Sequence, residues 1–238
     1  MVGPAAPASA GLNEAQREQQ EQEQEQEQEQ EQEQHKVMDI LVIAVVVAIA
    51  ALVLRRRQER QRIVLLASYL EPFQIEKLMA TLSEGYLRAL GENDPQRQLQ
   101  VWDHLRSAEL ALCEQFELFA KRFAGASADQ TRVSTLAWAI PWADRLFPAA
   151  SFDARKAIAI HAHGIRRAVQ VDPAEASKDR AYRLCAEMFL MQHTCHWFCK
   201  SRAVASARMW VRHKTRYEQL LDAVTPDTAR AYRALVIT

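Results

Sequence analysis

The feature that most constrains this chain is an unbroken run of 15 apolar residues from Ile40 to Leu54. The wider segment 37–54 contains 18 residues, and Asp39 carries its only charge. A helix needs about 17–25 mostly apolar residues to cross a hydrocarbon core of about 30 Å. The sequence therefore predicts a transmembrane helix over residues 37–54, with Asp39 at one membrane interface and Arg55 at the other.

Two alternatives to a membrane anchor are a cleaved signal peptide and a buried helix of a soluble protein. A signal peptide would have a basic segment before its apolar stretch and small residues after it. In this chain a long acidic segment comes before the run and three arginines follow it, which favours an uncleaved anchor. The anchoring residues that this pattern predicts are Ile40, Leu54, Arg55, Arg56 and Arg57.

The charge distribution predicts the orientation of the span. The chain carries 30 Lys+Arg and 30 Asp+Glu, but nine glutamates lie in residues 1–36 and five arginines lie in residues 55–62. Lys and Arg near a transmembrane helix collect on the cytoplasmic side. Arginine also far outnumbers lysine, a composition that we associate with GC-rich bacterial genomes. We therefore expect a single-pass protein of a bacterial inner membrane, with the N-terminus outside.

In this organisation residues 55–62 form a basic juxtamembrane segment, and residues 63–238 form a cytosolic domain. The four cysteines of a cytosolic domain would be reduced thiols. Residues 1–36 form an acidic, low-complexity tail that alternates strictly between Glu and Gln from Glu21 onward. The alternating tract has no apolar side chains to bury, so we expect disorder.

Residues 63–238 show helical rather than strand periodicity. Apolar residues recur every three or four positions, and no stretch alternates with a period of two between turn residues. The stripe that contains Trp102, Phe116 and Phe123 is typical of a helix facing a hydrophobic core. We therefore predict an all-α fold, in which a single transmembrane helix precedes a soluble bundle of about six to seven helices.

Prolines, glycines and capping residues set the expected helix boundaries. The membrane helix is expected to continue through residues 63–70, and the later helices begin at Pro72, Asp94-Pro95, Asp129 or Thr131, Ser151 or Asp153, Asp172-Pro173 and Thr225-Pro226. Pro141 is expected to bend or break the fourth of these helices. Neither Gly nor Pro occurs between Pro173 and Pro226, and one helix of that length would span about 75 Å. We therefore expect a break near residues 200–203.

The densest group of reactive side chains contains His193, Cys195, His196 and Cys199. These residue types bind zinc, so a metal- or thiol-dependent enzyme or sensor is one hypothesis for the chain. At 100° per residue the four spread over about 160° of a helix, which is too wide for one ion. Two of them would therefore need further ligands from elsewhere in the chain.

The nearest source of such ligands is the pair His161 and His163, which point about 200° apart on a helix. The alternative for this pair is one buried and one exposed histidine. Cys195 and Cys199 share a helical stripe with Leu184, Met188, Met191 and Phe198, so buried structural thiols are the alternative for them. We therefore expect no required cofactor, with zinc as the metal to test.

A second candidate site is basic and consists of Arg202, Arg208, Arg212, Lys214 and Arg216. Arg208, Arg212 and Arg216 are four residues apart and would share one face of a continuous helix. Arginine guanidinium groups bind phosphates and carboxylates in two-point fashion. An anionic lipid or an acidic protein is thus a candidate ligand, and nucleic acid is less favoured. The alternative is a solvated face paired with Glu218 or Asp222.

The segment from Leu136 to Phe147 is short, aromatic and apolar. Trp138 and Trp142 lie on either side of Pro141, and tryptophan favours the interface between membrane and water. The two interpretations are a kinked core helix and a segment that dips into the membrane interface.

The sequence excludes several catalytic classes. Its six glycines are too scattered for a phosphate-binding loop, and it contains neither Gly-x-Ser-x-Gly nor His-Glu-x-x-His. The carboxylates, such as Glu109, Glu114 and Glu117, are spaced as on a helix surface, so no acid/base pair is assigned. We therefore expect an interaction or scaffold module of a membrane-associated assembly, with membrane lipids around the span and a protein partner for the domain.

The first testable prediction concerns the acidic tract. Glutamate and glutamine are good helix formers, but strict alternation places glutamates at every i,i+4 pair, at a cost of a few tenths of a kcal/mol each. Circular dichroism of a peptide covering residues 14–34 should show coil at pH 7 and a gain of helix by pH 4, because protonation removes the repulsion. An unchanged helix content between these pH values would contradict the prediction.

Overall fold

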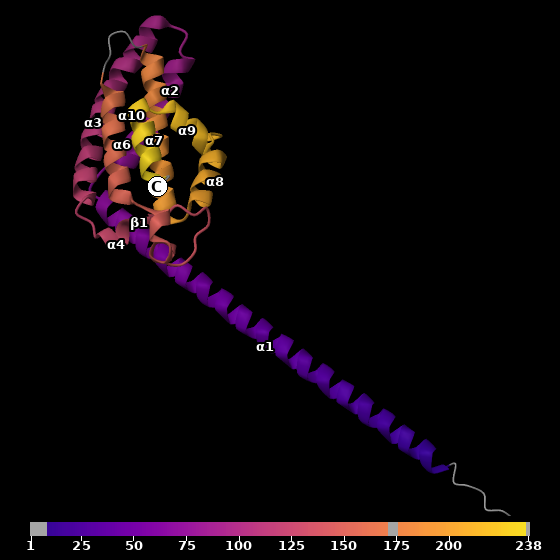
Figure 1. Cartoon of the computed structure of the whole chain (residues 1–238). Coiled ribbons are helices and arrows are strands. Elements are labelled where there is room, and N and C mark those ends of the chain that lie inside the picture. Colours follow the sequence, from indigo (N-terminus) through magenta and orange to yellow (C-terminus); the bar gives the residue numbers. More distant parts are fainter. Residues whose placement is uncertain (1–8, 171–175, 237–238) are drawn as a thin grey trace, which may run out of the picture. The chain divides into compact units, whose positions relative to one another are not determined.

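The computed structural model describes residues 9–170 and 176–236 (Figure 1). The chain divides into two compact units, residues 1–53 and residues 54–238, which we describe separately. The first unit contains most of helix α1 (Ser9–Leu70), and the second contains its last residues and all later elements.

The first unit contains the apolar run. The stretch His35–Leu70 includes a segment that is long and apolar enough to cross a membrane. The large apolar side chains from Val37 to Val53 are more than half exposed in this unit, as shown by Ile40 at 65%. Within the described residues of its own unit, the run therefore has no protein surface that covers it.

The backbone of the acidic tract differs from the coil expected at neutral pH, because α1 is helical from Ser9 onward. Glu and Gln both have favourable helix propensities. A tract that continues into an apolar helix also needs no separate nucleation step, which is the unfavourable part of helix formation. The balance between this continuity and the Glu–Glu repulsion is what the pH titration measures.

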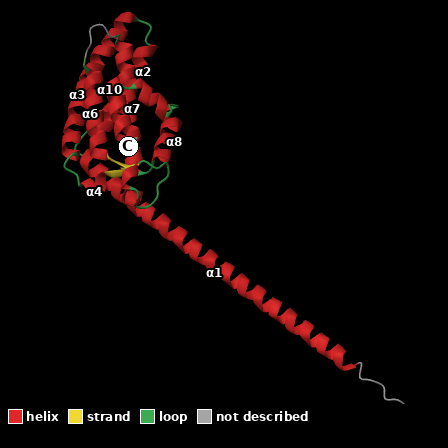
Figure 2. Ribbon diagram, viewed as in Figure 1, coloured by secondary structure: helices red, strands yellow, loops and turns green. Residues whose placement is uncertain are grey.

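The second unit is helical, which confirms the predicted all-α class (Figure 2). After α1 its helices are α2 (Ile75–Gly91), α3 (Pro95–Phe123), α4 (Ala128–Thr131), α5 (Ala143–Leu146), α6 (Ala154–Val169), α7 (Ser177–Cys199), α8 (Arg202–His213), α9 (Tyr217–Ala223) and α10 (Pro226–Val236). A 3-10 turn η1 (Pro148–Ala150) precedes the second of two short strands, β1 (Arg132–Ser134) and β2 (Ser151–Asp153). The described helices outnumber the six or seven expected, because several are only one or two turns long.

The core forms where α3, α6 and α7 pack together, with α2 on α3 and α10 on α6 (Figure 1). The predicted apolar stripe of α3 is buried from Trp102 to Phe123. Phe119 stacks on Phe123 with ring centroids 5.6 Å apart, and Phe123 meets Phe198 of α7 edge-on at 6.2 Å. Such aromatic pairs add about 0.5–1.5 kcal/mol to the free energy gained by burial.

Several predicted helix boundaries are confirmed. The Asp94 side chain accepts from the Gln96 amide at 2.9 Å and begins α3, and Asp153 caps α6 through the Arg155 amide at 2.9 Å. Such caps contribute about 1 kcal/mol each. The expected break falls between Cys199 and Arg202, where Ser201 caps α8. The helix start expected at Asp172-Pro173 lies outside the described residues, and the described part of α7 begins at Ser177.

The helix predicted from Asp129 or Thr131 onward is wrong. After α4 the chain forms β1, which pairs antiparallel with β2 so that Val133 faces Phe152. Both side chains are buried, at 1% and 4% exposure, and this burial favours the short strand pair over a longer helix. Pro141 lies in irregular chain and does not bend a helix.

A close crossing of α6, α7 and α10 occurs at Gly164. A Cβ atom at this position would collide with the carboxylate of Glu187 and the hydroxyl of Thr228. Glu187 is fully buried, and its Oε1 accepts from the amide and the hydroxyl of Thr225 at 2.9 Å each. The absent side chain therefore lets three helices meet around a buried carboxylate.

The second prediction follows from this crossing. Gly164→Ala should lower the free energy of unfolding by about 2 kcal/mol or more, because the methyl group overpacks a rigid, hydrogen-bonded site. Urea unfolding of the detergent-solubilised chain, followed by tryptophan fluorescence, measures the change. Gly91→Ala is the control, since a Cβ there meets nothing within 4 Å. Equal stabilities for the two variants would contradict the proposed crossing.

Candidate binding groove

The described part of the domain has an apolar groove of about 810 Å³. It lies between the last turns of α1, the first turns of α2, and the facing sides of α7 and α8. Leu66, Met79 and Met191 are buried beneath it, and Leu70 and Phe73 are half-buried at its edge. We call this hollow the α1–α7 groove.

The local sequence explains why the groove forms here. The residue before a proline is disfavoured in a helix, so Pro72 ends α1 and lets the chain turn into α2. The Phe73 amide donates to the Leu70 carbonyl at 2.9 Å, and the Phe73 ring packs edge-on against Phe119 at 6.2 Å. The turn thus fixes α1 and α2 as two walls above the α7 floor.

One side of the α1–α7 groove is basic. Arg208 of α8 lines it, and its Nη1 lies 3.2 Å from Nδ1 of His196. Burial lowers the pKa of His196, and the charges of Arg208 and Arg212 lower it further. His196 is therefore neutral at pH 7, and its ring accepts from the arginine. Among the side chains that the structure describes, no carboxylate lies within ion-pair distance of Arg208 or Arg212.

A second cation of the groove, Lys200, is neutralised from inside the domain. Its Nζ lies 2.5 Å from Oε2 of Glu59, and Arg55 contacts the other carboxylate oxygen at 2.9 Å. Burial raises the pKa of Glu59, but the hydrogen bonds from Lys200 and Arg55 outweigh burial and leave the pKa below its ordinary value. Glu59 is therefore an anion at pH 7, and Lys200 offers no free charge to a ligand.

The structure separates the four residues of the predicted metal cluster. His193 is buried between α7, α8 and α9, where its Nε2 lies 3.0 Å from the Ser206 hydroxyl and its ring stacks on Tyr217 at 4.7 Å. Cys195 and Cys199 face the α1–α7 groove, and His196 lies at its basic side. Among the described residues, no three His, Cys, Asp or Glu side chains are gathered to hold a metal ion.

The two groove thiols have the chemistry of buried cysteines. Burial raises the pKa of Cys199 to about 11, and burial together with the nearby Cys199 raises that of Cys195 further. Both are free thiols, and Cys195 Sγ lies 3.8 Å from the sulfur of Met191. Protonated thiols are poor nucleophiles, so at pH 7 these residues give the groove apolar surface.

The pair His161 and His163 consists of one buried and one exposed histidine, which is the alternative to metal binding. His161 is fully buried, and His163 is exposed on the same helix. Nε2 of His161 lies 2.8 Å from the Thr194 hydroxyl, which in turn lies 2.7 Å from the Tyr232 hydroxyl. Burial lowers the pKa of His161 to about 3, and it lowers that of His193 to a similar value.

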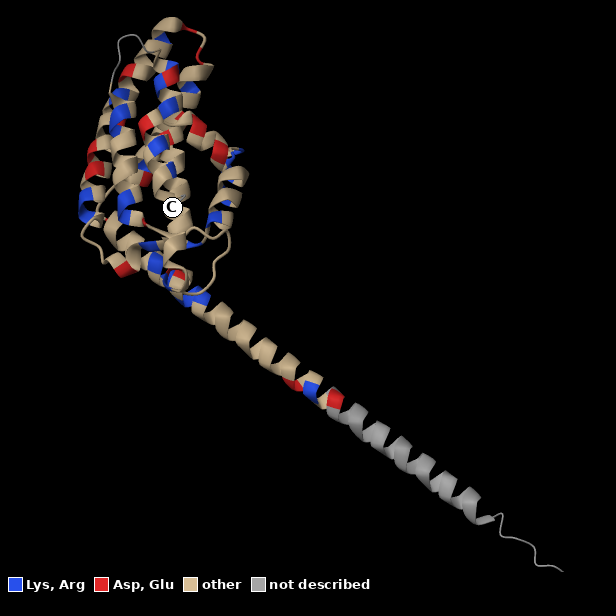
Figure 3. Ribbon diagram, viewed as in Figure 1, with Lys and Arg blue, Asp and Glu red and all other residues tan. Residues whose placement is uncertain are grey.

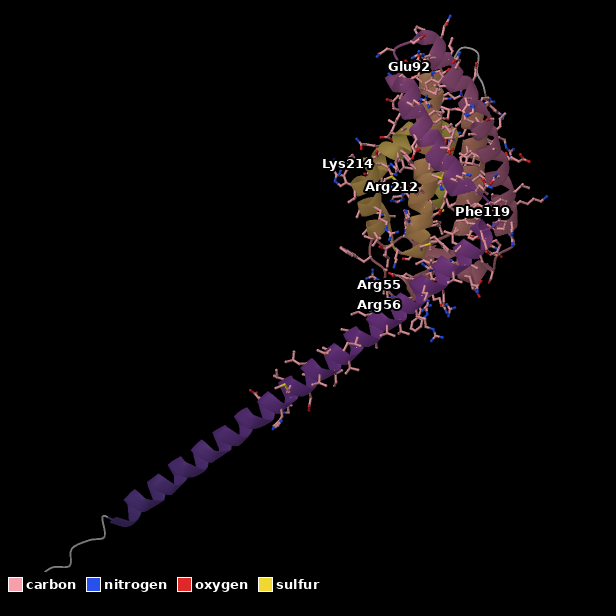
Figure 4. All side chains as sticks on the ribbon, turned by 180° about the vertical axis from the view of Figure 1, so that it is seen from behind. Arg55, Arg56, Glu92, Phe119, Arg212 and Lys214 are labelled. Carbon is pink, nitrogen blue, oxygen red and sulfur yellow. The ribbon has the colours of Figure 1, made fainter. Side chains whose placement is uncertain are left out.

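The predicted three-arginine face is wrong, because α8 ends at His213. Lys214, labelled near Arg212 in Figure 4, follows the last residue of α8 and adopts the left-handed conformation at φ 52°. Arg216 is the N-cap of the next helix, α9. Arg216 lies over the Trp210 ring at 5.8 Å, and Arg202 lies over the Trp197 ring at 5.8 Å. Only Arg208 and Arg212 of the predicted face share one helix.

Some groups near the core were missed by sequence reasoning. Glu109 is 1% exposed, whereas its spacing predicts a position on the helix surface. It accepts from the Tyr86 hydroxyl at 2.7 Å and from Arg106 at 2.9 Å. The signal was present, because Leu105 and Leu112 lie one turn before and after Glu109 on the buried stripe. Asp222, expected beside the basic residues, pairs instead with Arg233 at 2.7 Å.

The third prediction uses the two buried histidines. Their folded-state pKa of about 3 lies below the unfolded value of about 6.5, so the unfolded chain binds the extra proton in acid. The free energy of unfolding should therefore fall as the pH drops from 6.5 towards 3, with each histidine accounting for about 2 kcal/mol between pH 7 and 5. Urea unfolding at the two pH values measures this loss.

His161→Gln should reduce that loss by about 2 kcal/mol, because one of the two titrations is removed. The exposed neighbour gives the control, and His163→Gln should leave the loss unchanged. An identical pH dependence for wild type and His161→Gln would show that His161 is protonated equally in both states.

Comparisons with known protein families, with curated proteins and with solved structures found no match to this chain. The groove and the charges around it therefore carry the functional interpretation.

Proposed function

We propose that the chain is a single-pass membrane protein whose helical domain binds an amphipathic helix of a protein partner in the α1–α7 groove. The domain acts on the cytosolic side as an interaction module of a membrane-associated assembly. The observation that carries the proposal is an open apolar groove lined by Arg208, with Arg212 one turn further along α8, and no described carboxylate neutralises either arginine.

The anchor is supported by the exposed apolar helix and by its flanks. The side chains from Val37 to Val53 would be covered by lipid, which accounts for their exposure within their own unit. The arginines of residues 55–62 favour the cytosolic side for the domain and the outer side for the acidic N-terminal segment. In a bacterium this corresponds to the inner membrane.

The form and charge of the groove support a helical partner. Helix-binding grooves accept a row of apolar side chains at i, i+3, i+4 and i+7 on an apolar floor. The buried part of the lining has this character at Leu66, Met79 and Met191, and half-buried Phe73 lies at its edge. Arg208 and Arg212 then favour acidic residues on one flank of the partner helix, because complementary charges give orientation and specificity.

The two other hypotheses for this chain find less support in the geometry. The four His and Cys residues of the metal hypothesis point to different surroundings, and both groove thiols are protonated at pH 7. The continuous arginine face of the lipid or nucleic-acid hypothesis is interrupted after His213. The acidic partner helix therefore remains the function that the described residues favour.

The fourth prediction tests this partner directly. A photocrosslinking amino acid such as p-benzoylphenylalanine at position 73 of the full chain should form an adduct in intact cells, because Phe73 borders the groove. The crosslinked segment should have apolar residues at helical spacing and an Asp or Glu beside them. The control is the same amino acid at Leu87, which is 73% exposed on the neighbouring helix α2.

Charge reversal supplies a second, independent criterion. Arg208→Glu with Arg212→Glu should reduce the adduct about tenfold, equivalent to about 1.4 kcal/mol of binding free energy. Reversal at the exposed Arg88 of α2 should leave it unchanged. Replacing the identified acid of the partner by Lys should restore the adduct. Adducts confined to position 87, or insensitive to the α8 charges, would overturn the proposed function.

A further inference from the structure

The segment between β1 and η1 displays large apolar side chains to solvent. We call residues 136–147 the tryptophan loop. Trp138 is 74% exposed, Leu146 63%, Phe147 50%, and Ile140 and Trp142 46% each. Soluble surfaces rarely gather this many large apolar groups in twelve residues, and such patches usually contact another molecule or a membrane. This exposure contradicts the interpretation of the segment as a kinked core helix.

The tryptophan loop is held in place by its backbone and by a buried carboxylate. The Trp142 amide donates to Gln58 Oε1 at 3.2 Å, and Gln58 Nε2 donates to Asp144 at 3.3 Å. Asp144 is 6% exposed and pairs with Arg62 at 3.5 Å. The Ala203 amide also donates to the Ala137 carbonyl at 3.1 Å. The apolar side chains are thus presented by a fixed backbone.

One part of this backbone is strained. Trp142 has φ 54° and ψ 25°, the left-handed conformation, which costs a residue with a side chain about 1–2 kcal/mol. Its hydrogen bond to Gln58 and the buried Asp144 beside it hold that conformation. The side chain at this strained position is 46% exposed, and strained backbone is found most often at functional sites.

The position of the tryptophan loop follows from its partners on α1. Gln58 is four residues after Leu54, the last residue of the apolar run, so along the helix it is at most about 6 Å beyond the run. The headgroup region on each side of a bilayer is about 5–8 Å thick. The Trp142 amide is hydrogen-bonded to the Gln58 side chain, so Trp142 lies within one side-chain length of a residue that is at headgroup level when Leu54 lies at the edge of the hydrocarbon core.

Basic side chains surround the tryptophan loop on the α1 side. An open hollow of about 690 Å³ lies between α1 and the loop, and Arg57, Arg60, Arg145 and Trp142 line it. Figure 3 shows basic residues gathered where these elements meet, and Figure 4 shows Arg55 and Arg56 at the opposite end of the domain from Glu92. Basic residues near an anionic leaflet each contribute about 1 kcal/mol of attraction.

From these observations we infer that the tryptophan loop inserts its apolar side chains into the interface of an anionic bilayer, while Arg57, Arg60 and Arg145 bind lipid phosphates. The inference rests on the membrane span of the proposed function. It explains why tryptophan is displayed here, since its ring favours the boundary between headgroups and acyl chains. The domain is then held against the membrane at a second place besides its anchor.

The fifth prediction uses tryptophan fluorescence of the full chain in vesicles. Vesicles containing phosphatidylglycerol and phosphatidylcholine brominated in the acyl chains should quench the wild-type emission. Trp138→Phe with Trp142→Phe should lose more than about half of that quenching, because Trp102 and Trp197 are buried in the core. Trp210→Phe is the matched control, since Trp210 is 48% exposed on α8 and should not contact lipid.

The charges are tested separately. Arg57→Gln, Arg60→Gln and Arg145→Gln together should reduce quenching in vesicles with phosphatidylglycerol and leave it unchanged in purely zwitterionic vesicles. These exposed arginines leave the Asp144 contacts intact, so the folded domain is retained.

Alkaline carbonate extraction distinguishes an error in the proposed bilayer contact of the tryptophan loop from an error in the proposed transmembrane helix. A chain that stays in the membrane but shows equal quenching with and without Trp138 and Trp142 overturns the bilayer contact and leaves the anchor in place. Quenching that disappears in the Trp210→Phe control would assign the contact to α8, and it would also overturn the inference. A chain extracted from the vesicles overturns the proposed span itself.

Discussion

The structure depends on the attachment of the end of α1 to the rest of the helical domain. Glu59 is the centre of this attachment, because its carboxylate contacts both Lys200 at the end of α7 and Arg55 one turn earlier on α1. Arg62 adds a second link through Asp144 and the Arg132 carbonyl, the latter at 2.8 Å. Breaking one partner of such a buried pair leaves an uncompensated charge, so these contacts hold the helix in one position. The same segment of α1 forms a wall of the α1–α7 groove and the support of the tryptophan loop.

The polar interior of the domain shows how the remaining helices obtain a unique arrangement. Glu109 and Glu187 are buried carboxylates with hydrogen-bond partners on neighbouring segments, Tyr86 for the first and Thr225 for the second. His161 joins α6 to α7 through Thr194. Burying a polar group is unfavourable unless its hydrogen bonds are made, so each of these contacts penalises alternative helix packings. Gly164 belongs to the same arrangement, because only a missing side chain leaves room for the carboxylate of Glu187.

The sequence predicts those parts of the fold that short-range signals, such as caps and apolar periodicity, determine. Asp94 and Asp153 each cap a helix as predicted, and the aromatic stripe of α3 is buried because its spacing matches the helical repeat. The sequence did not predict the local structure where contacts between residues far apart in the chain determine it. Residues 132–153 form strands and a loop because of contacts with distant residues. Val133 pairs with Phe152 across the two strands, Asp144 forms an ion pair with Arg62, and the Trp142 amide donates to Gln58. The groove was missed for the same reason, since its walls come from segments more than 100 residues apart in the chain.

The proposed groove and the proposed bilayer contact have opposite requirements that the same short helix segment meets. A groove needs apolar surface that remains open to a partner, and Ile63, Leu66 and Leu70 provide it on the side of α1 that faces α7. A bilayer contact needs cations beside aromatic rings, and Arg57 and Arg60 provide them beside the tryptophan loop. The two sets are separated along the helix axis, because Arg57 and Arg60 precede Ile63, Leu66 and Leu70 in the chain and each residue adds about 1.5 Å of rise. A bilayer that holds the tryptophan loop therefore also fixes α1, and with it the groove wall, so membrane contact keeps the partner site in position without occupying it.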